Sequence, residues 1–233
     1  IINKWYFFWS RDFRRRLTIS RSKPAHRWSE RRDRLGLGKQ AKILTPQQVK
    51  AVTAYLGTHR NGLRNQAIFL LTVKAGLRAK EIACLKWSMV LEPNGAVGEA
   101  IHLTNTASKG RSGRIIPLNK ELKQHLEQIL AKEQINSRFD SRTSFVITTE
   151  RSSHTSPQAI VTMFYRWYAE LGLVGCSSHS GRRTFITNAA RKISSVGGSL
   201  RDVQALAGHS SLSVTQRYIE GDEQARIKVV DLL

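Results

Sequence analysis

Acidic residues, cysteines and long apolar runs are all scarce in this sequence. Its 233 residues include 17 Asp and Glu against 38 Lys and Arg, a formal net charge of +21. The two cysteines, Cys84 and Cys176, are too few for a disulfide framework or a thiolate metal site, which fits a reducing cytoplasm. No segment approaches the roughly 20 apolar residues of a membrane-spanning helix. The sequence therefore argues against a disulfide-stapled secreted domain and against a helical membrane protein.

The excess of positive charge points to an anionic partner. A surplus this large is typical of proteins that bind a polyanion, with nucleic acid as the leading candidate and an anionic membrane surface as the second. A charge that only keeps the protein soluble is the remaining alternative. Hydrophobic residues make up 40% of the chain, so a sizeable core can form.

Residues 1–40 hold 12 Lys and Arg but 3 Asp and Glu, and they show no sustained helical or strand period. We predict a basic, flexible arm that binds phosphates without sequence preference. A vestigial leader is the alternative. The aromatic start lacks a small-residue cleavage site, which argues against a signal peptide. Because the chain begins without Met, a fragment of a longer protein is also an open interpretation.

Apolar periodicity and capping residues predict a mainly helical body after the arm. Thr45 suits an N-cap, Pro46 suits the first helical position, and Gly76 suits a helix C-terminus. The predicted helices cover about residues 46–56, 62–75, 78–86, 120–134, 157–171, 179–192, 200–207 and 211–219.

Between residues 87 and 118 the pattern changes to short β-rich segments. Segments 87–91, 100–104 and 114–118 are separated by turn signals at Asn94-Gly95 and at residues 109–113. We predict an α+β domain over residues 41–221, mainly helical with a small three-stranded antiparallel sheet. A charged and then apolar tail follows over residues 222–233.

Several polar side chains of this domain suit attack on a phosphodiester. Tyr218 is the candidate nucleophile, because a tyrosine hydroxyl can form a phosphotyrosine ester that stores the bond energy for rejoining. Arg78 and Arg182 are candidate phosphate ligands, because guanidinium groups stay charged and bind phosphate oxygens in pairs. Arg182 follows His179 by three residues, which places both on one helical face.

Four other residues would handle protons or orient these groups. Lys109, at the tip of a predicted hairpin, could protonate the leaving 5′ oxygen. His179 and His209 could hydrogen-bond the phosphate or carry the tyrosine proton. Glu81 follows Arg78 by three residues and could orient its guanidinium. Each residue alone is a weak signal, because exposed arginines are usually solvated; the ordered set carries the hypothesis.

These residues lie in four segments: Gly76–Trp87, Lys109–Leu118, His179–Thr184 and Ala207–Tyr218. In this order they resemble the first arginine box, the β-hairpin lysine, the His-x-x-Arg box and the nucleophile box of tyrosine recombinases, the phage integrase family. The resemblance covers about residues 42–230. It implies a mixed α/β catalytic domain, a 3′-phosphotyrosyl intermediate formed without a metal or other cofactor, and strand exchange within a tetramer on two DNA sites.

The resemblance also implies a role for each candidate. Tyr218 would be the nucleophile and Lys109 the general acid, and Glu81 would support the site. Phosphate binding and proton handling would fall to Arg78, Arg182, His179 and His209. We expect further DNA contacts from Lys86, Arg111, Arg114, Arg183 and Arg217. Arg183 stands where many family members carry a second histidine.

The implied partners are double-stranded DNA, three further copies of the chain in a homo-tetramer, and an accessory DNA-binding protein; no membrane partner is expected. The implied setting is the cytoplasm, with a protein that is encoded by a bacterium or by a phage or plasmid. Members usually place a helical core-binding domain before the catalytic domain, whereas 40 residues precede it here. We therefore expect weak clamping of DNA by this chain alone.

Three functions stay open at this point. The first is a site-specific recombinase or integrase, the second a truncated recombinase that binds DNA without recombining it, and the third a type IB topoisomerase-like enzyme. The apolar side chains of the tail raise a parallel question. The resemblance suggests that the tail is donated to a neighbouring subunit, and docking on its own domain is the alternative.

Overall fold

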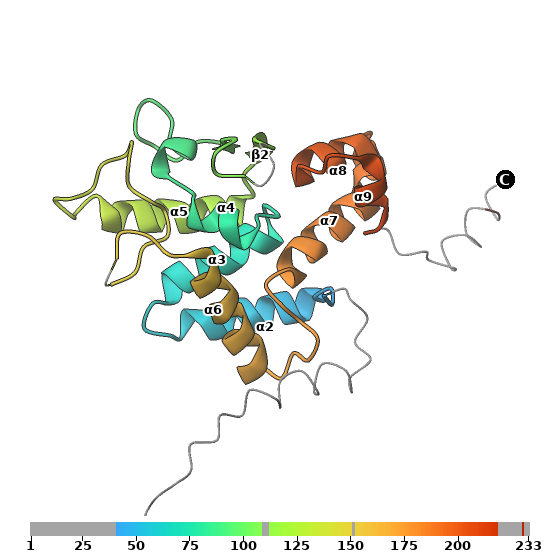
Figure 1. Ribbon diagram of the computed structural model, residues 1–233, viewed down its shortest axis with the longest axis horizontal. Helices are drawn as coiled ribbons and strands as arrows, with labels where there is room; N and C mark the ends of the chain where they lie inside the picture. Colours follow the sequence, from blue (N-terminus) through green and yellow to red (C-terminus); the bar gives the residue numbers. More distant parts are fainter. Residues whose placement is uncertain (1–40, 109–111, 151, 219–229, 231–233) are drawn as a thin grey trace, which may run out of the picture. The chain divides into compact units, whose positions relative to one another are not determined.

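The computed structural model describes residues 41–108, 112–150, 152–218 and 230. The predicted arm and most of the predicted tail lie outside the described residues. The helices are α2 (Pro46–Gly57), α3 (Gly62–Val73), α4 (Ala79–Ala83), α5 (Lys120–Glu133), α6 (Pro157–Glu170), α7 (Ser180–Lys192), α8 (Leu200–Ala207) and α9 (Leu212–Gln216), as Figure 1 shows. Two short 3-10 helices, η1 (Trp87–Met89) and η3 (Ile193–Val196), join them.

The helix-start and helix-stop signals acted largely as predicted. Thr45 caps α2, because its side chain accepts a hydrogen bond from Gln48 N while the Gln48 side chain accepts one from Thr45 N. Gly208 caps α8 with a left-handed φ of +61°, whereas α3 ends at Val73, before the predicted Ala75, and Gly76 follows it with φ +66°. α4 and α9 also end earlier than predicted, at Ala83 and at Gln216.

The described sheet has two strands, so the predicted third strand is wrong. β1 (Ala100–Leu103) pairs antiparallel with β2 (Arg114–Pro117), with Ile101 opposite Ile116. Residues 87–89 of the predicted strand form η1 instead, because Met89 N donates to Lys86 O and Val90 N donates to Trp87 O, and Leu91 makes an isolated antiparallel bridge with Val97. This tight turn buries Trp87, Met89 and Val90 together, which an alternating strand cannot do.

The buried apolar side chains form two clusters of very different size. The larger one takes side chains from α2 to α6 and from both strands. The smaller one, among the described residues, consists of Ile186, Val203 and Ala207 with partly buried neighbours, and it joins α7 to α8. Figure 1 shows α8 and α9 beside α7. No helix in the described part of the chain is long and apolar enough to cross a membrane.

α7 connects the two clusters because its first turn lies directly on α3. Gly181 approaches Thr72 so closely that a Cβ at residue 181 would lie 2.0 Å from Thr72 Oγ1. Three residues later, Thr184 Oγ1 accepts a hydrogen bond from Leu44 N at 2.9 Å. The fold thus fixes the start of α7 on the larger cluster, and Arg182 follows Gly181 immediately.

Candidate active site

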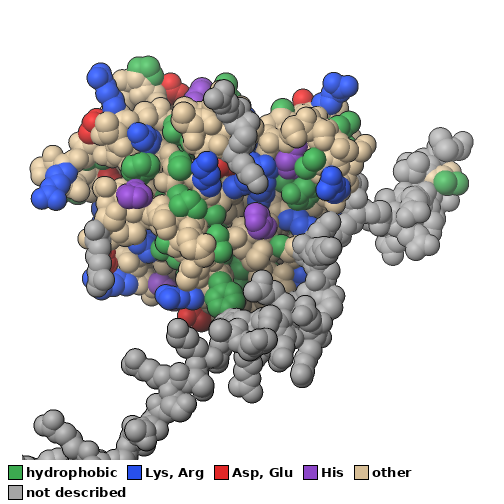
Figure 2. Space-filling view, in the orientation of Figure 1, with side chains coloured by type: hydrophobic (Ala, Val, Ile, Leu, Met, Phe, Trp, Pro, Cys, Tyr) green, Lys and Arg blue, Asp and Glu red, His purple; other side chains and the backbone are tan. Residues whose placement is uncertain are grey.

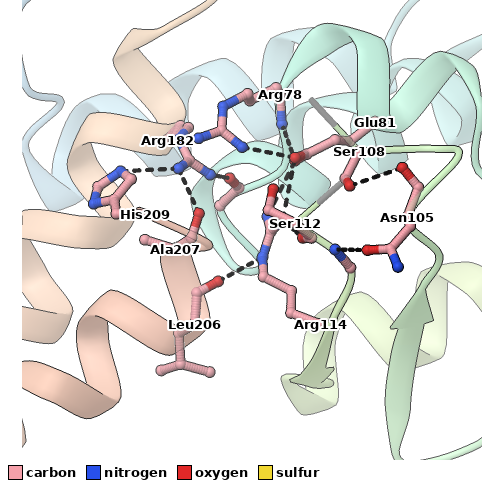
Figure 3. A network of polar contacts seen from close by, with 12 residues as sticks. Arg78, Glu81, Asn105, Ser108, Ser112, Arg114, Arg182, Leu206, Ala207 and His209 are labelled. Atoms are coloured by element: carbon pink, nitrogen blue, oxygen red, sulfur yellow. Dashed lines mark hydrogen bonds and ion pairs between the residues drawn. The ribbon is translucent and has the colours of Figure 1, made fainter. Parts of the chain in front are cut away.

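Glu81 is fully buried on α4 and lies between two arginines (Figure 3). Its carboxylate accepts hydrogen bonds from Arg78 N at 2.9 Å and from Arg78 Nη1 at 2.7 Å. Arg114, on β2, donates to the same carboxylate from Nη1 and Nη2, each at 3.1 Å. The predicted pairing of Arg78 with Glu81 is present, and Arg114 joins it.

Two opposing effects set the ionisation of Glu81. Burial raises the pKa of a carboxyl group because it removes water from the charged form. The hydrogen bonds and charge of Arg114, together with those of Arg78, outweigh burial and hold the pKa of Glu81 below its usual value. Glu81 is therefore a carboxylate at neutral pH, and it is a fixed counter-charge inside the site.

Arg182 is held by main-chain carbonyl groups on two sides. It is 3% exposed, and Nη1 donates to Gly76 O at 2.5 Å while Nη2 donates to Ala207 O at 2.6 Å. Nη2 also donates to His209 Nε2 at 3.0 Å. Burial and the neighbouring charge of Arg78 lower the pKa of Arg182 to about 10, so it stays protonated at neutral pH. Arg182 is a positioned cation that links the end of α3 to the end of α8.

His209 follows Gly208 and turns back toward Arg182. Because a guanidinium can only donate, His209 Nε2 accepts, so Nδ1 carries the proton and donates to Thr215 Oγ1 at 2.9 Å. Burial, followed by the charges of Arg182, Arg78 and Arg114, lowers the pKa of His209 to about 4. His209 is therefore a neutral imidazole at physiological pH in the DNA-free protein.

Tyr218 lies two residues beyond the end of α9, on a turn and not within the helix predicted for it. Its ring stacks on the His209 ring, with centroids 5.3 Å apart and an interplanar angle of 23°. Its main chain is held at two points: Tyr218 N donates to Thr215 O, and Thr187 Oγ1 donates to Tyr218 O, each at 3.0 Å. The ring also packs against the smaller apolar cluster.

Two pockets that share Val214 surround these side chains. The first, of about 720 Å³, is lined by Arg78, Arg114, Arg201, Gly208, His209 and their neighbours. The second, of about 370 Å³, is lined by Ala41, Ser177, His179, Arg182, Arg183, Arg217 and Tyr218. Figure 2 shows Lys, Arg and His side chains gathered on this face, over the region where α4, α7 and α8 meet in Figure 1. The surface around the candidate residues is thus basic and concave.

The structure brings together five of the six predicted catalytic residues: Arg78, His179, Arg182, His209 and Tyr218. Arg78 and Tyr218 line different pockets, and Arg182 with its bond to His209 lies between them. His179 is exposed at the N-cap of α7. The predicted general acid Lys109 lies outside the described residues, as does Arg111.

The predicted DNA-contact residues that the structure describes do not all lie at the two pockets. Arg183 and Arg217 line the Tyr218 pocket, and Arg183 Nη1 also donates to Ala41 O at 2.9 Å. Lys86 lines neither pocket; its Nζ lies over the Phe145 ring, 5.5 Å from the centroid. Arg114, whose side chain is 6% exposed, lines the first pocket and also donates to Glu81 and to Leu206 O. Most of this side chain therefore faces the protein interior, and its contact with DNA stays a prediction.

Sequence reasoning also missed two hydroxyl groups that hold the site residues. Thr215 is the partner of His209 Nδ1, and Thr187 holds the main chain of Tyr218. The alternation of side chains along β2 could have predicted that Arg114 points inward, since Arg114 and the buried Ile116 lie on the same face of the strand. In the described ranges, no three His, Cys, Asp or Glu side chains are grouped as ligands for a metal ion.

Comparison with known proteins decides the family. The sequence model described as the phage integrase family matches residues 42–225. The chain belongs to the phage integrase family. One similar family member is tyrosine recombinase XerC of Shewanella sp. (strain ANA-3), 29% identical over 202 residues, which are 84% of this chain and 63% of XerC. Another is tyrosine recombinase XerD of Xanthomonas axonopodis pv. citri (strain 306), 31% identical over 188 residues, 76% of this chain and 57% of XerD.

Solved structures of integrase-family proteins share the fold. The Tn1549 transposon integrase in complex with circular intermediate DNA matches with a TM-score of 0.63 at 20% identity, over 82% of this chain and 67% of that one. The crystal structure of XerA recombinase matches with a TM-score of 0.64 at 20% identity, over 82% and 64% of the two chains. This integrase-family chain spans less than two thirds of the length of the curated relatives named above.

Proposed function

We propose that this chain is the catalytic part of a site-specific tyrosine recombinase, which cleaves and rejoins double-stranded DNA through a 3′-phosphotyrosyl intermediate. One observation carries the proposal: the buried Arg182 is bonded to His209, and His209 stacks on Tyr218. A nucleophile beside a fixed cation and an imidazole suits phosphoryl transfer, where positioning and charge stabilisation dominate. The family membership and the basic surface support the same reaction.

In the proposed cleavage step, the Tyr218 hydroxyl oxygen bonds to the scissile phosphorus and the bond to the 5′ oxygen breaks. The tyrosine proton passes to a nearby base, with His179 in the same pocket as the candidate. Lys109 gives a proton to the leaving 5′ oxygen. The charge that develops on the non-bridging oxygens is stabilised by Arg78 and Arg182. Attack of a 5′ hydroxyl on the phosphotyrosine reverses these transfers and rejoins a strand.

A nicked suicide substrate tests this proposal, because loss of the short cleaved strand traps the covalent adduct. We expect the wild-type chain to form an adduct and Tyr218→Phe to form none, since the phenyl ring lacks the attacking oxygen. Tyr165→Phe is the matched control, because Tyr165 is 60% exposed on α6 and lines neither pocket. Adduct formation by Tyr218→Phe would reject Tyr218 as the nucleophile.

A plasmid assay separates recombination from simple strand cleavage and rejoining. We expect products that join two copies of the cognate site, and no relaxation of supercoiled plasmids that lack the site. Relaxation of any plasmid would favour the topoisomerase-like alternative. DNA binding without either product would favour a remnant that no longer recombines.

The proposed active assembly is a homo-tetramer in which each tail docks on a neighbouring copy. A groove of about 690 Å³ between α2, α3 and α7 suits an apolar segment, because Leu44, Val49, Val73, Phe185 and Ala189 line it. The tail offers Ile227, Val229, Val230, Leu232 and Leu233.

Deletion of residues 222–233 tests the docking proposal. We expect the truncated chain to bind DNA but to lose higher assembly on DNA, measured by sedimentation of the protein–DNA complex. Substitution of exposed Val196 by Ser is a control for the loss of a surface apolar side chain outside the groove. A tetramer that persists after the deletion would reject subunit exchange of the tail.

A further inference from the structure

Arg114 contacts two other elements of the protein through its guanidinium. Its Nε donates to Leu206 O at 2.8 Å, next to the end of α8. Its Nη1 and Nη2 each donate to a different oxygen of Glu81 at 3.1 Å. The guanidinium therefore joins β2 to α4 and to α8 (Figure 3).

Arg114 shares Glu81 with Arg78. Glu81 Oε1 accepts from Arg78 Nη1 at 2.7 Å and from Arg114 Nη1 at 3.1 Å. The two arginines differ in exposure: the Arg78 side chain is 22% exposed and the Arg114 side chain 6%. Both arginines line the adjoining pocket, and Arg78 is the one with more of its side chain free to contact a ligand there.

A single arginine could not serve Glu81 and a phosphate equally well. A buried carboxylate without a cation is strongly unfavourable, so a lone partner would be held at Glu81 and its donors would be withheld from an incoming phosphate. A second cation relieves this competition, because Glu81 stays neutralised when Arg78 turns some donors outward. The bidentate geometry of Arg114 suits this task, since two parallel N–H groups hold one carboxylate.

We propose that Arg114 is a positioning residue that neutralises Glu81 and so releases Arg78 for a DNA phosphate. The inference rests on the proposed function insofar as the phosphate is the one that Tyr218 attacks. It differs from a purely mechanical role, in which Arg114 only ties β2 to α8 through Leu206 O. Gly208 packs against the same guanidinium, because a Cβ at residue 208 would lie 2.9 Å from Arg114 Nη1, so a mechanical role is the natural competitor.

A double-mutant cycle separates the two roles. Arg114→Met removes both the charge and the bond to Leu206 O. Adding Glu81→Gln removes the carboxylate that would then hold Arg78, but it does not restore the bond to Leu206 O. Neutralisation therefore predicts rescue by the second substitution, whereas a mechanical tie predicts none.

The rate of adduct formation on the nicked substrate, at saturating DNA, is the first readout. We expect Arg114→Met to lower this rate by at least about tenfold, and the double variant to recover most of that loss. Arg114→Lys keeps the charge without the fork, and we expect an intermediate rate. A double variant no faster than Arg114→Met would overturn the proposal. Arg138→Met controls for loss of one positive charge, because Arg138 is exposed and lines neither pocket.

Affinity for an intact DNA duplex, measured for the wild type, Arg114→Met, Glu81→Gln and the double variant, keeps the inference separate from the cleavage proposal. We expect Arg114→Met to weaken binding and the double variant to restore it, whether or not an adduct forms. If the wild type forms no adduct but the cycle appears in the affinity, the cleavage proposal fails and the role of Arg114 stands. If Glu81→Gln rescues Arg114→Met in neither the adduct rate nor the DNA affinity, the proposed role of Arg114 is overturned. Thermal unfolding of each variant identifies folding defects, and we expect the double variant to melt above Arg114→Met.

Discussion

The two halves of the candidate site rest on different amounts of buried structure. Arg78 and Glu81 belong to α4, whose Ile82 and Ala83 are part of the larger apolar cluster. His209 follows α8 and Tyr218 follows α9, and both lie beside the smaller cluster of three fully buried residues on α7 and α8. Arg182 lies on the boundary, because Gly181 packs on α3 while Ile186 belongs to the smaller cluster.

This difference separates the arginine side chains, which are positioned before DNA binds, from Tyr218, which is held more loosely. The guanidinium groups have carboxylate and carbonyl partners before any DNA is present, which is the preorganisation that charge stabilisation requires. Tyr218, by contrast, is held among the described residues by two main-chain hydrogen bonds, a ring stack on His209 and packing against the smaller apolar cluster. Segments with few buried contacts open at low free-energy cost, so we expect nucleophile placement to respond to DNA and to neighbouring subunits.

Disrupting the contact of α7 with α3, which joins the two halves of the site, should have the largest effect on stability. In Gly181→Ala the new Cβ would lie 2.0 Å from Thr72 Oγ1 and 2.7 Å from Thr72 Cβ. Overpacking of this kind costs more than the gain in helix propensity returns, so we expect a net loss of about 2 kcal/mol in the free energy of unfolding. The melting temperature should fall by roughly 4–8 °C. Displacement of Arg182 should also slow adduct formation.

Gly172→Ala is the control for this substitution. Gly172 has φ +65° and no neighbour within 4 Å of its added Cβ, so the cost there is backbone strain alone, roughly 1 kcal/mol. We expect adduct formation by Gly172→Ala to match the wild type. Equal losses of stability in the two variants would show that the α3–α7 contact tolerates a side chain.

Local signals predicted the scaffold of the site better than its internal contacts. The Thr45 cap and the glycine stop at Gly208 depend on neighbouring residues only, and they set the helix ends as predicted, whereas α3 ends at Val73, ahead of Gly76. The η1 turn depends on how Trp87 packs in the core, which a strand-like residue pattern does not encode. The inward direction of Arg114 likewise depends on Glu81, which is 33 residues away in sequence.

The position of His209 beside the boundary residue Arg182 predicts a pH effect on stability. Its folded pKa of about 4 lies below the unfolded value of about 6.5, so the unfolded chain binds the proton more readily in this window. Stability from this group is complete above pH 6.5 and is lost as the pH falls toward 4. After a discount for solvent screening, we expect a loss of roughly 1–2 kcal/mol.

His209→Gln removes this titration and leaves the other acidic and basic groups in place. Urea unfolding of both proteins at pH 7 and pH 4.5 should show that the wild type loses more stability than the variant on acidification. A stability difference that is the same at both pH values would contradict a lowered His209 pKa.

The smallest expected effect on stability comes from removing one of the hydrogen bonds that hold Tyr218. Thr187→Val keeps the volume of a side chain that is 1% exposed, but it removes the hydroxyl that donates to Tyr218 O. We expect a loss of about 1 kcal/mol in the free energy of unfolding, the typical worth of one hydrogen bond. Because the lost bond fixes the main chain of the nucleophile, adduct formation should slow while DNA affinity stays unchanged. Thr53→Val is the matched control, since Thr53 Oγ1 makes a comparable bond to Val49 O on α2. If both substitutions leave the adduct rate at the wild-type value, the position of Tyr218 does not depend on α7.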